Sequence, residues 1–200
     1  MNSLKQVILT ITAAIILIPA FSQDKHSQDY YYQIPSCPEN YTAVTVAARM
    51  IDGLGFRYYW ATDGLRDQDL AYRPNDQART SLETLIHIYN LSEIIAHAVK
   101  KEPNMDEDRP EYGFRELRDR TLENFRTASD ILKKSSDKDL EDYKIIFKDK
   151  NGETVYPFWN LLNGPMADVL WHIGQVVSFR RSSGNPYDGK NNVFTGKRDE

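Results

Sequence analysis

Apolar residues recur at intervals of three and four positions through most of the chain, a spacing that predicts amphipathic helices. The pattern predicts four long helices, over residues 40–64, 81–100, 113–134 and 158–182. The second is apolar nearly all round, as is typical of a helix buried between others, whereas the third has only a narrow apolar stripe. Because each helix must bury its apolar face against a partner, we expect an all-α fold, an up-down four-helix bundle.

Two pairs of residues interrupt this helical pattern. Asn151–Gly152 lies between β-favouring runs within residues 144–157, which predicts a small β-hairpin between the third and fourth helices. Gly164–Pro165 must start, kink or interrupt the fourth helix, because proline lacks an N–H donor and clashes with the preceding turn.

Glycines and aromatic residues mark expected packing positions. Gly53 and Gly55 are poor helix formers, and we expect them to let another helix approach the first one closely. The aromatic cluster at residues 58–60, together with Trp159 and Trp171, predicts packing in the core or in a dimer interface, with pocket lining as the less favoured alternative.

The first 22 residues have the pattern of an export signal. Lys5 supplies the positive end, residues 7–21 are almost unbroken apolar sequence, and Ala20 and Ser22 place small residues before a cut at Gln23. A retained membrane anchor is the alternative, although the apolar span is a little short for a transmembrane helix. We therefore expect a secreted protein, most simply in a bacterial periplasm, with no membrane contact after cleavage.

The remaining residues suit a single domain. We expect an extended lead-in over residues 23–39 and one bundle domain over residues 40–200. The net charge is −4 and no basic block with interleaved aromatic residues is present, which disfavours nucleic acid as a partner. The single cysteine, Cys37, cannot form an internal disulfide, so it is buried, paired between chains or a free thiol.

The candidate chemistry lies in two apolar helices. Asp168 and His172 are four residues apart and share a helix face, and His87 lies in the second helix. Metal sites of four-helix bundles are built in the core from facing helices, so these residues predict a set of two histidines and one carboxylate. Such a set suits Zn, Ni or ferrous iron and leaves positions open. A hydrogen-bonded core histidine and a local Asp–His bond remain the alternative, and His97 lies on a different face from His87.

Three stretches also match a known pattern. Residues 65–74 are like a Leu-x-x-Glu-Leu-x-x-x-Pro linker, and residues 81–88 are like a second-helix segment whose histidine binds metal. Residues 168–186 are like a His-x-x-x-His-x-x-Gln helix with an Arg-x-x-Gly ending. On these motifs, and with a charged third helix between them, residues 40–186 resemble the DinB superfamily. These are four-helix metal-binding proteins that include the YfiT-like hydrolases and bacterial thiol-dependent transferases.

The resemblance implies that His87 and His172 bind a divalent metal: Zn, Ni, Fe or Mn. The superfamily usually has histidine at position 168; Asp168 is a competent ligand for the same metals, but it could instead mark a site that has drifted and binds nothing. Gln175, one turn beyond His172, either orients a ligand or is a surface or capping residue. Arg180 is expected to be structural, since a cation near a helix C-terminus suits the helix dipole.

The resemblance further implies a metal-dependent enzyme that acts on a small molecule, and we expect a homodimer. Hydrolysis by a metal-bound water is favoured over thiol transfer, because an exported protein does not meet a cytoplasmic thiol. No catalytic side chain can be assigned. The alternative is a non-catalytic bundle that binds a partner or a metabolite, with Asp168 as the mark of a degenerate metal site.

Overall fold

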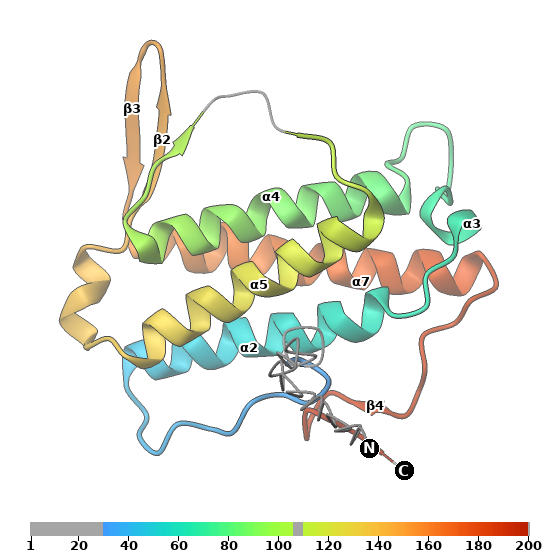
Figure 1. The fold of residues 1–200 in the computed structure, drawn as a ribbon, viewed down its shortest axis with the longest axis horizontal. Coiled ribbons are helices and arrows are strands. Elements are labelled where there is room, and N and C mark those ends of the chain that lie inside the picture. Colours follow the sequence, from blue (N-terminus) through green and yellow to red (C-terminus); the bar gives the residue numbers. More distant parts are fainter. Residues whose placement is uncertain (1–29, 106–109, 200) are drawn as a thin grey trace, which may run out of the picture.

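The computed structural model describes residues 30–105 and 110–199, so the predicted export signal and the first part of the lead-in lie outside the described residues. Four long helices pack against one another: α2 (Ala43–Thr62), α4 (Ser81–Lys100), α5 (Phe114–Lys133) and α7 (Ala167–Ser182). The predicted four-helix bundle is confirmed (Figure 1). Among the described residues, no helix combines the length and the apolar character that crossing a lipid bilayer requires.

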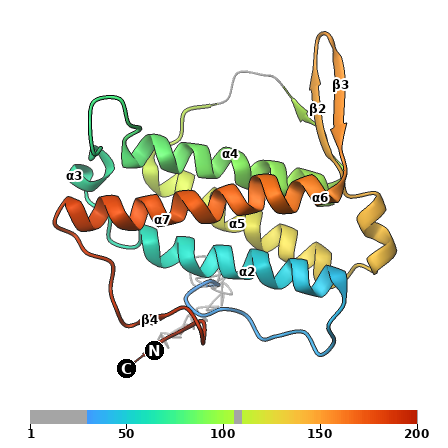
Figure 2. The ribbon, with the colours of Figure 1, turned by 180° about the vertical axis from the view of Figure 1, so that it is seen from behind.

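The direction of the helices differs from the prediction. α5 and α7 each pack against both α2 and α4. Followed along the colour bar, α4 and α5 run the same way, whereas α2 and α7 run the opposite way (Figures 1 and 2). The expected strict up-down alternation is therefore wrong. The reason lies in chain length: about 13 residues join α4 to α5 and can span roughly 43 Å, more than the roughly 30 Å of a 20-residue helix.

A small sheet stands at one end of the bundle (Figure 1). The predicted hairpin is confirmed: β2 (Ile145–Asp149) pairs antiparallel with β3 (Gly152–Tyr156), between α5 and α6. The turn itself is Lys150–Asn151, one position earlier than the sequence indicates, and Asp149 accepts hydrogen bonds from the backbone N–H groups of Asn151 and Gly152. The sequence did not predict β1 (Asn104–Met105), which pairs parallel with β2. Since β1 follows α4 and β2 follows α5, this pairing holds the C-terminal ends of the two helices together.

The fourth predicted helix is interrupted, as Gly164–Pro165 indicates. A short helix, α6 (Phe158–Leu161), leads into the wide turn η2 (Leu162–Met166), and α7 begins only at Ala167. Gly164 has a non-helical backbone there, with φ −96° and ψ −105°. α6 and α7 follow nearly the same line on the two sides of the break, and η2 lies against α4 (Figure 2).

The linker after α2 is tied to the end of α7 by a buried carboxylate. Asp69, in the short helix α3 (Asp67–Leu70), accepts bonds from the Arg66 guanidinium and backbone N–H at 2.8 to 2.9 Å. It also accepts from the Ser183 hydroxyl and from Asn185 Nδ2 at 2.7 Å. These donors, Arg66 foremost, hold the pKa of Asp69 well below its ordinary range. We call Arg66, Asp69, Ser183 and Asn185 the Asp69 cluster; it joins two of the stretches that carry the resemblance.

Arg180 is structural, but its partner differs from the expected one. Its guanidinium donates to the carbonyls of Trp60 and Ala61 at 3.1 and 3.0 Å, and to the carbonyl of Asn185 at 2.9 Å. It therefore satisfies carbonyls at the C-terminal end of α2, which have no partner within that helix.

The close approach expected at Gly55 is made by an aromatic ring and not by another helix. The ring of Tyr31 lies so near that a Cβ on Gly55 would be 2.4 Å from it. The buried Tyr31 hydroxyl donates to Asp52 at 3.3 Å, and Asp52 also pairs with Lys133 at 2.8 Å. Residues 30–39 thus pack onto the bundle without forming a helix or strand.

The aromatic residues separate into two groups. Residues 58–60 are buried in the core, as predicted. Trp159 and Trp171 are 75% and 71% exposed, so the expectation that they pack in the core of the chain is wrong. Cys37 is exposed, which excludes the buried state among the three that its sequence left open.

Candidate metal centre

The structure brings together the three side chains that the sequence selected. His87 comes from α4, and Asp168 and His172 come from consecutive turns of α7. His87 Nε2 lies 3.2 Å from Asp168 Oδ2, and His172 Nε2 lies 3.3 Å from Asp168 Oδ1. One donor atom from each residue falls within 4.8 Å of the other two. We call these three residues the metal cluster, because the group could hold a metal ion.

The local fold explains why the three side chains meet. Val169 and Ile173 form part of the buried stripe of α7, and at about 100° per residue Asp168 and His172 lie along one edge of that stripe. This edge faces α4, which packs directly against α7. His87 lies beside the fully buried Ile88, so its backbone position is held by the core. All three side chains are partly exposed, which leaves the cluster accessible to solvent.

The ring of His172 is held by a hydrogen bond on the side away from the cluster. His172 Nδ1 lies 2.7 Å from Gln175 Oε1, which can only accept a hydrogen. In the neutral imidazole this bond places the proton on Nδ1 and leaves the lone pair of Nε2 facing Asp168. The lone pair of Nε2 and the Asp168 oxygen, 3.3 Å apart, are then both available to a cation. Gln175 thus has the position expected of a residue that orients a metal ligand.

The surroundings of the His87 imidazole favour its neutral form. Burial lowers the pKa of His87; the nearby His172 and Arg79 lower it further, while the hydrogen bond to Asp168 acts in the opposite direction. The two rings meet edge to face, with centroids 4.6 Å apart. Neutral imidazole is the form that binds metals, so this environment suits a ligand. The sequence did not single out Arg79, since nothing in its spacing relative to His87 marks it.

The distances fit the donor set of a small divalent ion. Ligands at about 2.0–2.1 Å from a tetrahedral metal lie roughly 3.3–3.4 Å from one another. The two histidine-to-carboxylate distances, 3.2 and 3.3 Å, are close to this separation. Each imidazole thus lies at this distance from a different oxygen of Asp168, and one donor atom from each of the three residues lies within 4.8 Å of the other two.

His97 lies away from His87, as its position on a different helix face predicts, and its contacts are structural. Its Nδ1 bonds to Asn104 Oδ1 at 3.0 Å, and Asn104 Nδ2 donates to the carbonyl of Ile146 at 3.1 Å. These two hydrogen bonds connect the end of α4 to β1 and β1 to β2. His97 is thus a structural residue outside the metal cluster.

No protein-family model, no curated protein and no solved structure matches this chain. The resemblance to the DinB superfamily therefore rests on the motifs in the sequence alone. The bundle and the converging donor atoms of the metal cluster are the observations that bear on function.

Proposed function

We propose that this protein is an exported, DinB-like metal-dependent hydrolase that acts on a small molecule. The observation that supports it is the convergence of His87, Asp168 and His172 on a partly exposed seam between two long helices. A set of two histidines and one carboxylate is typical of sites for Zn, Ni, Fe or Mn that keep positions open for water and substrate.

The residues of the proposed site have two roles, metal binding and orientation of a ligand. His87, Asp168 and His172 would hold the ion, and Gln175 fixes the ring of His172 so that Nε2 faces the cluster. When bound, a divalent metal makes a coordinated water more acidic and polarises a substrate oxygen. The carboxylate of Asp168 cancels one unit of the ion's charge, which favours a harder ion and a less acidic water than three histidines would.

The proposal includes location and assembly. The charged and apolar pattern of residues 1–22 supports export, and export favours hydrolysis over transfer from a cytoplasmic thiol. We also propose a homodimer, in keeping with the sequence expectation. None of these features depends on the metal cluster, so each can be tested separately.

A metal-dependence screen tests the proposed activity. The protein is stripped with a chelator, reconstituted with Zn, Ni, Fe or Mn, and assayed on small esters, amides and phosphoesters. We expect turnover that returns with one of these metals, is absent in His172→Ala and persists in His97→Ala. A protein that binds metal but turns over none of the three classes would favour the non-catalytic alternative.

A further inference from the structure

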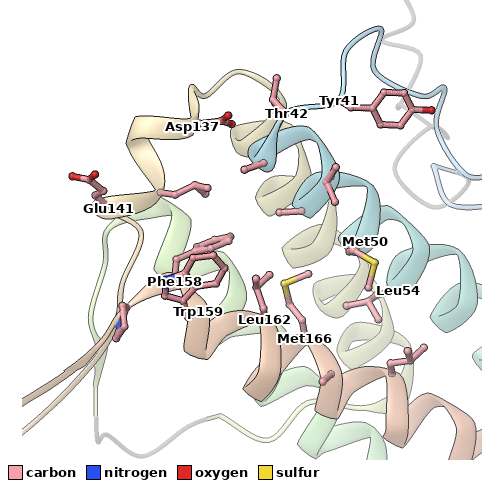
Figure 3. A pocket seen from close by; sticks show the side chains of 17 residues that line it. Tyr41, Thr42, Met50, Leu54, Asp137, Glu141, Phe158, Trp159, Leu162 and Met166 are labelled. Atoms are coloured by element: carbon pink, nitrogen blue, oxygen red, sulfur yellow. The ribbon is translucent and has the colours of Figure 1, made fainter.

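A second candidate site lies on the other side of α7, in an open groove of about 1160 Å³ (Figure 3). Its walls come from the first half of α2 on one side and from α6, η2 and α7 on the other, and η1 (Asp137–Glu141) closes one end. Most of the lining is apolar, including Val46, Met50, Leu54, Phe158, Leu162 and Met166.

The groove and the metal cluster use opposite edges of the same helix. Relative to the buried position of Val169, Met166 and Leu170 lie about 60° and 100° to one side, and Asp168 and His172 lie by similar angles to the other. The first pair faces α2 and the second faces α4. A ligand in the groove therefore does not contact the metal cluster, and the inference below does not depend on the proposed function.

The apolar lining is open to solvent. Met50, Val46, Leu170 and Trp159 are all exposed, although they form one continuous lining. Soluble proteins rarely expose such a patch unless it binds something. The two thioether side chains in the lining, Met50 and Met166, adapt easily to the shape of an apolar ligand.

The charge of the groove is confined to one end and has one sign. Asp137 and Glu141 are its charged lining residues, and both belong to η1. Asp137 Oδ1 accepts a hydrogen bond from the backbone N–H of Val44 at 3.1 Å, at the start of α2, whereas the exposed Glu141 lies at the rim of the groove with its carboxylate turned toward solvent (Figure 3). Lys138 lies on the same turn but does not line the groove.

Two aromatic side chains also belong to the lining. Figure 3 shows Trp159 beside Phe158 on one wall, whereas the ring of Tyr41, just before the start of α2, points away from the groove toward solvent. Carboxylates combined with exposed aromatic rings are the groups that recognise an ammonium cation. From the acidic end toward Met50 the lining is apolar, which suits a hydrocarbon chain.

We propose that this groove binds a single-chain amphiphile with an ammonium head group. The head group lies at the acidic end beside Glu141, and the alkyl chain lies along Leu162 and Met166 toward Met50. The volume is at the upper end of the range for small-molecule pockets, which gives room for one such chain.

Calorimetric titration of the purified protein tests the proposal with three probes that share one alkyl chain. Dodecyltrimethylammonium, dodecyl sulfate and a neutral dodecyl glycoside are titrated below their micelle-forming concentrations. We expect one ammonium amphiphile per chain, bound about tenfold or more tighter than the sulfate. Shortening the chain by two methylenes should weaken binding about 15-fold, because each buried methylene contributes roughly fourfold. Glu141→Gln should reduce the preference for the cation about threefold.

A matched pair of exposed positions provides the control. Met50→Arg places a bulky cation in the groove and should weaken binding of the ammonium probe at least about tenfold, whereas Val155→Arg on the hairpin should leave it unchanged. Equal unfolding temperatures of both variants show that the fold is intact. Equal binding of the sulfate, or wild-type binding by Met50→Arg, would overturn the proposal. So would a wild-type dimer that ignores the ammonium probe and dissociates in Met50→Arg, since the groove would then be an interface between two copies.

Discussion

Two aspartates of this protein sit beside basic side chains at the two ends of α7, and their surroundings differ. Asp69 is fully buried and receives donors from Arg66, Ser183 and Asn185. The side chain of Asp168 is 42% exposed and faces two imidazole nitrogens. One of these imidazoles, that of His172, is oriented by Gln175 so that its lone pair points at the carboxylate.

The difference separates a carboxylate with a structural role from one that we propose as a metal ligand. In the Asp69 cluster, N–H groups of Arg66 and Asn185 donate hydrogen bonds to both oxygens of the Asp69 carboxylate. Its negative charge is therefore stabilised entirely by groups of the protein. The carboxylate of Asp168 faces one hydrogen bond from His87 and the oriented ring of His172, and the three side chains together could hold a metal ion. Substitutions in the Asp69 cluster should therefore change the stability of the fold, and substitutions in the metal cluster should change metal binding.

Removal of a histidine from the metal cluster is expected to have the largest effect. His87→Ala and His172→Ala should each lower the affinity for a divalent metal by more than about 100-fold, which exceeds the usual loss for a residue that only orients a ligand. His97→Ala is the control: it removes the bond to Asn104 but no metal ligand. Titration with Zn²⁺ measures all three variants, and equal affinities would refute the assigned site.

Removal of the buried carboxylate should instead lower stability. Asp69→Ala removes the shared acceptor of Arg66, Ser183 and Asn185, and we expect the free energy of unfolding to fall by about 2–3 kcal/mol. The exposed Asp67, on the same short helix, is the control, and Asp67→Ala should change stability by less than about 0.5 kcal/mol. Metal affinity should be the same in both variants. Loss of metal binding in Asp69→Ala would break the distinction between the two clusters.

The stability difference between the wild type and Asp69→Ala should depend on pH. The folded pKa of Asp69 lies below the ordinary value of about 3.9, so its contribution to stability is fully present above that value. As the pH falls below about 4 toward the folded pKa, the folded state loses this advantage. The difference in unfolding free energy between the wild type and Asp69→Ala should persist at pH 5 and shrink at pH 3. An unchanged difference at pH 3 would show that the carboxylate charge is not its source.

A smaller effect is expected where a residue acts only through its neighbour. Gln175→Ala frees the ring of His172 and should weaken metal binding about tenfold, without removing a ligand. Gln175→Glu keeps the acceptor and should restore the affinity. Ser178→Ala, which alters α7 one turn further on, should have no effect on metal titration. If Gln175→Ala binds metal as tightly as the wild type, the orienting role is wrong.

The smallest change tests whether stability and binding are independent in α7. Gly174 is helical, and a Cβ there would meet nothing within 4 Å. Gly174→Ala should raise the free energy of unfolding by about 0.5–1 kcal/mol, because alanine has the higher helix propensity. It should leave metal affinity unchanged. Chemical denaturation and metal titration of the same sample check both statements, and reduced stability would reveal a constraint on this turn.

Local signals account for the parts of the fold that the sequence predicts correctly. The second helix was expected over residues 81–100 and is found at Ser81–Lys100, where Thr80 and Glu83 form reciprocal caps at its start. The hairpin turn and the break at Gly164 depend likewise on neighbouring residues. The metal cluster could be selected because two of its members lie one helical turn apart.

Features that depend on distant partners could not be predicted. The loop between α4 and α5 is long enough for either direction of α5, so helix spacing does not decide it. The ring against Gly55 comes from Tyr31, which lies 24 positions earlier and belongs to no helix or strand. Apolar residue type alone does not tell a core side chain from an exposed one, so the sequence left core, dimer interface and pocket open for Trp159 and Trp171; both are exposed, and Trp159 lines the groove.

The central claim is that the metal cluster binds an ion, and elemental analysis of the purified protein tests it most directly. The wild type and Asp168→Ala are incubated with Zn, Ni, Fe and Mn, freed of unbound metal and measured side by side. The account predicts about one divalent ion per chain in the wild type and none in Asp168→Ala. A wild type that remains free of metal, or a variant that retains it, would contradict the account.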